Sequence, residues 1–157
     1  MKYTFLFDFS RVLVFPKDKK YSGDLNPLYA KEASNKALNF DDYFIFNNEL
    51  IKYLRYLAST NEIYMFTSGL MQDDRVAQRK LEGIFRGIFS AEKMGMRKAD
   101  FTAYIKVART MGKSLPEIVF IDDNSANLKA ALEAGMKTIH YTDNKKLLKE
   151  LENFLEN

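Results

Sequence analysis

Three apolar runs in the sequence are each followed directly by residues that can bind phosphate or a metal ion. Asp8 follows YTFLF, Thr67 follows IYMF, and the pair Asp122 and Asp123 follows IVFI. A cation, Lys98, stands in the stretch GMRKAD, just before a segment with helical character. Carboxylates suit Mg²⁺, and a hydroxyl and a lysine can bind and neutralise phosphate oxygens. Together these residue types indicate phosphate chemistry with Mg²⁺.

The apolar runs are predicted to be buried strands of a parallel sheet, since strands covered on both faces are hydrophobic almost throughout. Helices and strands alternate along most of the chain, which is typical of a doubly wound α/β fold. We expect a mostly parallel five-stranded sheet flanked by helices, with ligands bound beyond the carboxyl ends of its strands. The expected strands are 3–8, 62–67, 87–90, 117–122 and 137–141, and the expected helices are 47–60, 72–85, 99–112, 125–134 and 144–155.

Residues at the helix ends support these boundaries. Asn124 or Ser125 can cap the helix 125–134, and Gly135 can end it in a left-handed conformation. Asp143 or Asn144 can cap the last helix in the same way.

Residues 9–46 interrupt the alternation and are interpreted as a flap and minimal cap inserted after the first strand of a single domain, 1–157. Within them we expect a hairpin in VLVFPKDKKY, a helix from Pro27 to about Lys36, and an aromatic stretch, DDYFIF. For the aromatic side chains, core packing is favoured over a substrate entrance or a dimer contact. These side chains are Tyr21, Tyr29, Tyr43, Phe44 and Phe46.

Composition narrows the class of protein. The chain has 157 residues, of which 46% are hydrophobic, enough for one well-packed domain. It has no cysteine and starts with no signal-peptide pattern, so a reducing cytoplasm is expected. The net charge of +3 is spread among acidic residues, and no apolar run approaches the roughly 20 residues of a membrane span. We therefore expect neither nucleic acid nor a membrane as a partner.

The motifs FLFDFSRVL, YMFTS, GMRKAD and VFIDDNSAN occur in the order found in the haloacid dehalogenase-like hydrolase superfamily, which the chain resembles over almost its whole length. Residues 89–141 are especially similar to the sugar-phosphatase-like members. A response-regulator receiver domain uses similar residues, but there the acidic pair comes first and the lysine last.

The resemblance implies that Asp8 is a nucleophile, which attacks phosphorus to give an aspartyl-phosphate that water then hydrolyses. It implies a Mg²⁺ site made of Asp8, Asp123 and the backbone carbonyl of Ser10, with Asp122 as a further ligand or a partner of the ligands. Asn127 is expected to orient the metal site.

The resemblance also implies a phosphate-binding set of Ser10, Thr67, Ser68 and Lys98, in which Thr67 and Lys98 act in catalysis. A solvated lysine at the start of a helix remains the alternative for Lys98. Arg97 is expected to serve the surface or the substrate, and His140 is given no role.

Ser10 departs from the superfamily pattern, because its phosphatases commonly carry there a second aspartate that acts as general acid and base. Such help is worth roughly 10²- to 10⁴-fold in rate, so alkyl phosphates should react slowly and activated esters less so. The first hypothesis is a Mg²⁺-dependent phosphatase with weakened activity. The alternative is a weak or inactive phosphate-binding or interaction module. Dehalogenation is disfavoured, because FSRVL offers no halide site.

The segment between Asp8 and Thr67 is too short for a full helical cap domain. Because caps exclude water and select small substrates, a reduced cap implies an open site. Such a site would take a phosphorylated small molecule or a larger phosphorylated substrate, or be covered by a second copy of the chain in a homo-oligomer.

Overall fold

The centre of the computed structural model, which describes residues 2–35 and 38–156, is a five-stranded sheet with the strand order β5-β4-β1-β6-β7. All neighbouring strands of this sheet are parallel. After β1 the chain builds the β4 and β5 side, then crosses to β6 and β7, so the strand order reverses between β1 and β6. The strands are β1 Thr4–Phe7, β4 Ile63–Thr67, β5 Gly87–Ser90, β6 Ile118–Asp122 and β7 Lys137–His140.

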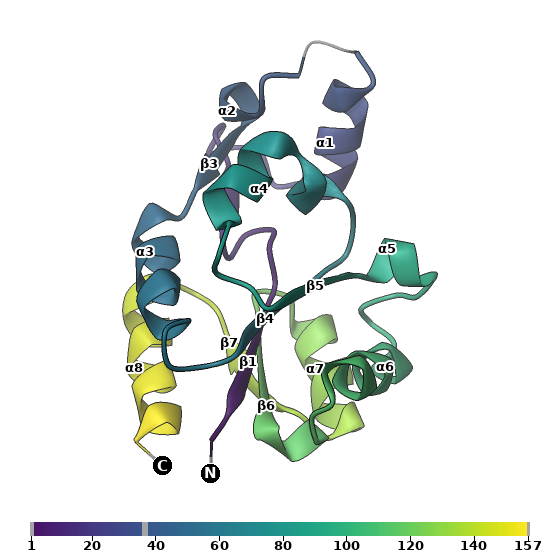
Figure 1. The fold of residues 1–157 in the computed structure, drawn as a ribbon. Coiled ribbons are helices and arrows are strands. Elements are labelled where there is room, and N and C mark those ends of the chain that lie inside the picture. The colour runs from purple at the N-terminus through teal and green to yellow at the C-terminus, as the bar shows by residue number, and fades with distance from the viewer. Residues whose placement is uncertain (1, 36–37, 157) are drawn as a thin grey trace.

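Helices cover both faces of the sheet, as expected for a doubly wound fold (Figure 1). Alternating side chains of one strand belong to different layers: Phe5 and Phe7 lie in one core cluster and Leu6 lies in the other. This alternation makes each strand hydrophobic throughout, which is the pattern that predicted it. One layer holds α3 Asn48–Leu57 and α8 Asn144–Leu155, and the other holds α6 Phe101–Met111 and α7 Ser125–Ala134.

The helix ends resolve the two expected capping alternatives. Asn124 caps α7 by accepting hydrogen bonds from the amides of Ala126 and Asn127. Gly135, with φ of +107°, ends the same helix, as predicted. Asp143 caps α8 by accepting a hydrogen bond from the Lys146 amide.

The insertion after β1 lies with α4 beyond the carboxyl ends of the strands (Figure 1). The hairpin expected in VLVFPKDKKY is wrong, because β2 pairs antiparallel with β3, far along the chain. The turn at Asp18 instead leads the chain away into α1, so the partner of β2 comes from the aromatic stretch. The insertion comprises β2 Val14–Pro16, α1 Leu25–Ala33, α2 Phe40–Tyr43 and β3 Phe44–Phe46.

Two expected helices differ in their bounds. Helix α1 begins at Leu25 rather than at Pro27, which stands in its first turn, where a missing amide hydrogen is tolerated. The expected end near Lys36 lies outside the described residues. In place of a helix over 72–85 there is a 3₁₀ turn, Met71–Asp73, followed by α4, Arg75–Leu81.

The division of that helix has a local cause. The side chain of Asp74 accepts a hydrogen bond from the amide of Val76 and so starts a new helix at Arg75. Downstream, a short helix that the sequence did not predict, α5 Ala91–Met94, follows β5.

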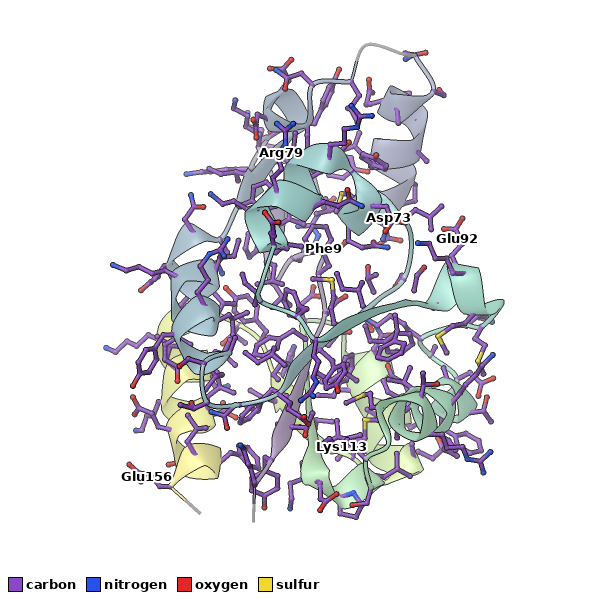
Figure 2. All side chains as sticks on the ribbon, in the orientation of Figure 1. Phe9, Asp73, Arg79, Glu92, Lys113 and Glu156 are labelled. Carbon is purple, nitrogen blue, oxygen red and sulfur yellow. The ribbon has the colours of Figure 1, made fainter. Side chains whose placement is uncertain are left out.

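Side chains fill the space between the sheet and the insertion (Figure 2). Phe9, directly after β1, is fully buried and packs in the cluster that contains Leu25 of α1 and Phe44 of β3. Core packing is thereby confirmed for Phe44, whereas Tyr43 is 36% exposed. Partly buried side chains packed against the same cluster include Tyr21, Tyr29 and Phe46. The single-domain organisation of 1–157 stays a prediction. No helix among the described residues is long and apolar enough to cross a membrane.

Candidate active site

The carboxyl ends of β1, β4 and β6 bring the predicted residues together. Asp8 follows β1, Thr67 is the last residue of β4, and Asp122 is the last residue of β6, the two strands paired with β1. Oxygen atoms of Asp8, Asp122 and Asp123 all lie within 4.8 Å of one another. The sequence analysis therefore placed these side chains at the correct edge of the sheet.

Lys98 lies in the loop between α5 and α6 and connects two of the carboxylates. Its Nζ lies 2.7 Å from Oδ1 of Asp8 and 2.8 Å from Oδ2 of Asp122. The residue is 4% exposed, so it is not a solvated lysine at a helix start. The rings of Phe66 and Phe120, with centroids 5.5 and 5.2 Å from Nζ, flank the ammonium group and favour its charge.

A residue that the sequence analysis missed holds the backbone of Lys98. The hydroxyl of Tyr104, on α6, donates a hydrogen bond of 2.8 Å to the Lys98 carbonyl. The Tyr104 ring packs edge-on against Phe66 and Phe120. The loop that carries Lys98 is thus fixed from inside the core.

Both carboxylate oxygens of Asp122 are already bonded within the protein. Oδ1 accepts from the Asn124 amide at 2.7 Å, and Oδ2 accepts from Asn127 Nδ2 at 3.0 Å as well as from Lys98. The predicted contact of Asn127 with the acidic cluster is therefore present, through Asp122. Asp8 accepts a hydrogen bond from Lys98 through Oδ1, and the side chain of Asp123 interacts with that of Asp122.

Burial and the neighbouring charges shift the pKa values of the side chains in the cluster. Burial, together with the charge of Asp122, raises the pKa of Asp8 to about 8. The same two causes raise the pKa of Asp123 to about 6. Burial lowers the pKa of Lys98, but the charges of Asp8 and Asp122 outweigh it and raise that pKa overall. Three carboxylates therefore share one buried ammonium group, and the site favours a further cation.

The donor set fits Mg²⁺. The grouped atoms are carboxylate oxygens, the hard ligands that this ion prefers, and no softer nitrogen or sulfur ligand belongs to the described cluster. With Asp122 occupied by protein donors, Asp8 and Asp123 are the carboxylates best able to reach a metal ion.

Two hydroxyl oxygens are buried at this edge without a partner in the described part of the chain, Thr67 Oγ1 and Ser10 Oγ. Leaving a buried polar atom unpaired costs about 1–3 kcal/mol, so each hydroxyl needs a partner, which a bound ligand or a water molecule can provide. The ligand could accept from either hydroxyl.

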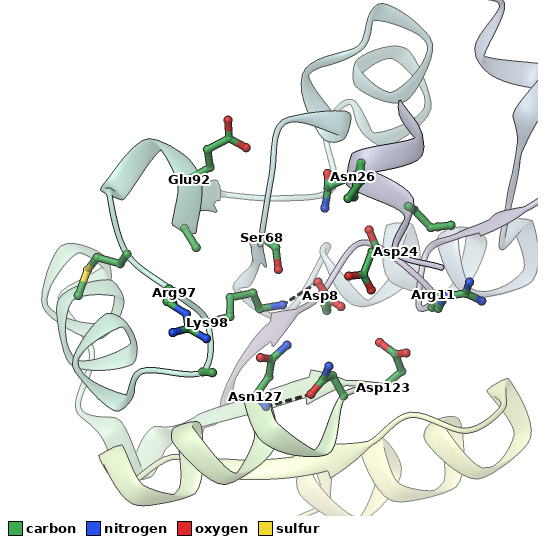
Figure 3. A pocket seen from close by; sticks show the side chains of 17 residues that line it. Asp8, Arg11, Asp24, Asn26, Ser68, Glu92, Arg97, Lys98, Asp123 and Asn127 are labelled. Atoms are coloured by element: carbon green, nitrogen blue, oxygen red, sulfur yellow. Dashed lines mark hydrogen bonds and ion pairs between the residues drawn. The ribbon is translucent and has the colours of Figure 1, made fainter. Parts of the chain in front are cut away.

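A cavity of about 570 Å³ opens above this cluster (Figure 3). Its floor includes Asp8, Ser68, Lys98 and Asp123, and Arg97 also lines it, consistent with a role toward the substrate. Its walls also contain residues that the sequence analysis did not select, namely Arg11, Asp24, Asn26, Glu92 and Asn124.

Arg11 shapes the wall contributed by the insertion. It is the one non-glycine residue of positive φ (59°) in the described chain, and its guanidinium donates to the carbonyls of Tyr21 and Gly23 at 3.1 and 2.8 Å. A Cβ at Gly69 would lie 2.5 Å from Cγ of Asn26, so the loop after β4 approaches the Asn26 side chain of α1 this closely because residue 69 has no side chain. No sequence pattern signalled either contact. His140, which was given no role, donates from Nε2 to the Asp123 carbonyl at 3.0 Å.

A model of the family described as NLI interacting factor-like phosphatase matches residues 3–157. A sesquiterpene phosphatase of Aspergillus oryzae is 40% identical over 60 residues, which are 38% of this chain and 31% of that protein. The enolase-phosphatase E1 of Aquifex aeolicus is 34% identical over 82 residues, 49% of this chain and 36% of that enzyme. The chain thus spans about a third of the length of these curated relatives.

Solved structures share the fold. A HAD family enzyme from Bacteroides thetaiotaomicron, solved in complex with magnesium and inorganic phosphate, superposes with a TM-score of 0.68 at 15% identity, covering 94% of this chain and 99% of that one. A predicted HAD-like hydrolase from Porphyromonas gingivalis gives a TM-score of 0.71 at 15% identity, covering 100% and 99%. The doubly wound fold expected from the sequence is confirmed.

Proposed function

The chain belongs to the NLI interacting factor-like phosphatases, hydrolases with the haloacid dehalogenase-like fold, and on this premise we propose that it hydrolyses a phosphate monoester with Mg²⁺ through an aspartyl-phosphate on Asp8. The observation that carries the proposal is the buried bridge from Lys98 to Asp8 and Asp122, at the floor of a cavity. The likeness to sugar-phosphatase-like members stays a prediction.

In this proposal, Asp8 is the nucleophile. Its Oδ1 accepts a hydrogen bond from Lys98, and its amide donates a hydrogen bond of 2.8 Å to the Ile121 carbonyl, so the residue is held at the sheet edge, where it lines the cavity. Holding a nucleophile in one orientation removes much of the entropic cost of attack. The carboxylate then attacks phosphorus in line and displaces the ester oxygen.

The phosphoryl oxygens are bound by the groups that are unpartnered or cationic at this edge. Thr67 Oγ1, buried and without a partner in the described structure, would donate to one oxygen, and the Ser68 amide to another. Lys98 would offset the negative charge that builds up between the Asp8 carboxylate and the phosphoryl group. Ser10 Oγ, also buried and unpaired, is a further donor.

Asp8, Asp123 and the Ser10 carbonyl would hold Mg²⁺, with Asp122 keeping Lys98 and Asn127 in place. The bound ion would supply positive charge where two anions must approach each other. The substrate, a phosphorylated small molecule or a larger phosphorylated molecule, remains a proposal, as do a homo-oligomer over the site and a cytoplasmic location.

The direct test is hydrolysis of 4-nitrophenyl phosphate with and without Mg²⁺. We expect metal-dependent turnover that Asp8→Asn abolishes and that Asp41→Asn, at an exposed aspartate of α2, leaves unchanged. Quenching with hydroxylamine should convert the acyl phosphate to a hydroxamate at residue 8, which mass spectrometry detects.

Ser10 is the observation that favours a second candidate, a phosphate-binding or interaction module without activity. That candidate predicts phosphate and Mg²⁺ binding by calorimetry but no turnover of the aryl ester by the native chain. Such a result would overturn the phosphatase proposal.

A further inference from the structure

The proposed reaction lacks a group to protonate the leaving oxygen. Ser10 cannot do this near neutral pH, and Lys98 is held by Asp8 and Asp122, whose charges keep it protonated. The remaining carboxylates that line the cavity, among the described residues, are Asp123, Asp24 and Glu92. Asp123 is assigned to the metal, which leaves Asp24 and Glu92.

Asp24 stands at the N-cap position of α1, yet its side chain caps nothing. Its backbone is extended, with φ −67° and ψ 140°, but the carboxylate accepts no hydrogen bond from the helix amides. An aspartate in this position normally makes that bond and gains about 1 kcal/mol from it. Within the described chain the carboxylate has no other hydrogen bond or ion pair, so it is free to act in the cavity.

Asp24 and Glu92 differ in the direction in which their side chains point. In Figure 3 the Asp24 carboxylate is turned toward that of Asp8, whereas the Glu92 carboxylate, on the far side of the cavity, points away from it. Asp24 therefore faces the region where the leaving group of a phosphate ester attacked by Asp8 would lie.

The backbone at Asp24 is fixed from two sides. The Tyr21 hydroxyl donates 3.0 Å to the Asp24 carbonyl, and Arg11 donates 2.8 Å to the carbonyl of the preceding Gly23. Arg11 directly follows Ser10, so the loop in which serine stands in place of the usual acid also carries the side chain that anchors the residue before Asp24. A fixed backbone limits the positions that the carboxylate can reach, and a general acid must come within hydrogen-bond distance of the oxygen that it protonates.

We propose that Asp24 is the general acid and base of the phosphatase reaction, in place of the aspartate that Ser10 has replaced; this rests on the proposed function. In the first step Asp8 forms a bond to phosphorus, the bond from phosphorus to the ester oxygen breaks, and that oxygen takes the proton from Asp24. In the second step water attacks phosphorus, Asp24 takes its proton, and the bond to Asp8 breaks. Alcohol and phosphate leave, and both carboxyl groups return to their starting states.

The first test compares leaving groups. An alkyl phosphate needs a proton on its leaving oxygen far more than 4-nitrophenyl phosphate does, so Asp24→Asn should lower kcat/KM about 100-fold or more for the alkyl ester and much less for the aryl ester. Glu92→Gln is the matched control, since it removes the same charge from the same cavity, and it should change both esters alike. Asparagine is itself a good N-cap residue, so Asp24→Asn should fold, which thermal melting checks.

The second test examines the role of Asp24 as general base in the hydrolysis of the aspartyl-phosphate. In Asp24→Asn the first step on the aryl ester stays fast while hydrolysis of the aspartyl-phosphate slows. We expect a burst of nitrophenol equal to the enzyme concentration, followed by slow turnover. Ser10→Asp should restore turnover in the Asp24→Asn background but add little to the native chain, because the two carboxylates would do the same work.

The outcomes separate the two proposals. A native chain without Mg²⁺-dependent hydrolysis would overturn the proposed function and this inference with it. An active native chain in which Asp24→Asn and Glu92→Gln lower both esters equally, without a burst, would overturn the role of Asp24 alone.

Discussion

Lys98 is the residue on which the acidic cluster depends. Its ammonium group is the one cation bonded to Asp8 and Asp122 in the described structure, and all three side chains are almost fully buried. Breaking a buried ion pair from one side leaves an uncompensated charge, which costs about 3–5 kcal/mol. The stability of the metal-free protein should therefore reveal the bridge without any assay of activity.

We predict that Lys98→Met lowers the free energy of unfolding by about 3 kcal/mol, measured by urea denaturation without metal. The matched control is Lys113→Met, which removes the lysine of an ion pair with Glu62 that is partly exposed at the opposite end of the sheet. That loss should stay below about 1 kcal/mol. Equal losses in the two variants would contradict the bridge.

Thr67 offers a test of the phosphate site that leaves the protein's stability almost unchanged. Its buried hydroxyl has no partner in the described structure, so Thr67→Val should be neutral or slightly stabilising without ligand. Inhibition by inorganic phosphate should weaken about 10- to 100-fold, because a hydrogen bond to an anion is lost. Thr4→Val, a buried threonine at the other end of the sheet, should leave the inhibition constant unchanged. Destabilisation with unaltered inhibition would argue against the assignment.

Among the single residues, the sequence predicted the side chains whose positions follow from strand ends, namely Asp8, Thr67, Asp122 and Asp123. It also predicted Lys98, through the likeness of GMRKAD to a known motif. It missed Asp24 and Arg11, because their positions in the cavity depend on the path of an irregular loop and on a positive φ at Arg11. Neither leaves a mark in residue type or spacing.

Among the contacts between elements, those of Asn47 join the insertion to the rest of the fold. It caps α3 through the Leu50 amide, and its Nδ2 lies 2.9 Å from the Val12 carbonyl and 2.8 Å from Asn144 Oδ1. One side chain thus connects the loop after β1, the start of α3 and the start of α8. We therefore expect this side chain to help orient the insertion over the cavity.

Asn47→Ala should lower the free energy of unfolding by about 3 kcal/mol, as a lost cap and several lost buried hydrogen bonds combine. Chemical denaturation measures this loss, with Asn61→Ala as the control, since the Asn61 side chain donates an exposed hydrogen bond to the hydroxyl of Thr60. The control should change stability by less than about 0.5 kcal/mol. A small loss in Asn47→Ala would mean that apolar packing alone holds the insertion.

Helices and strands were predictable where the hydrophobic pattern and caps within one segment were enough to define it. The five strands of the sheet and the helices α3, α6, α7 and α8 fall where hydrophobic runs and caps indicate. The pairing of β2 with β3 was not predictable, because it joins segments far apart in sequence, with Val14 opposite Phe46 and Pro16 opposite Phe44. The predicted hairpin paired segments that are close in sequence, and it was wrong.

The stability of the whole molecule should depend on pH through its acidic cluster. The pKa of Asp8 rises from 3.8 to about 8 on folding. A raised carboxyl pKa adds stability that is fully present below pH 3.8 and is lost as pH rises through about 8. Asp123, whose pKa is raised to about 6, has an effect of the same sign on stability, which is lost at lower pH than that of Asp8. The metal-free protein is therefore penalised at neutral and alkaline pH by this cluster.

In the proposed site Mg²⁺ would bind the ionised carboxylates, so it should reverse this penalty. We predict that the apparent affinity for Mg²⁺ rises about 10- to 100-fold between pH 6 and pH 8, since fewer protons must be displaced. The increase in Tm on adding Mg²⁺ should be correspondingly larger at pH 8. Calorimetry and thermal melting measure both, and Asp8→Asn should remove most of the pH dependence. An affinity that does not change with pH would exclude these carboxylates as the ligands.

The missing side chain at residue 69 leaves room for one side chain of the cavity wall. Because a Cβ there would lie 2.5 Å from Cγ and Oδ1 of Asn26, Gly69→Ala should displace the Asn26 side chain, which stands in the first turn of α1. A designer could thus reshape the α1 wall of the cavity from a position outside the acidic cluster. The same geometry makes residue 69 a point at which a single natural mutation would alter this wall while Asp8, Asp122 and Asp123 stay in place.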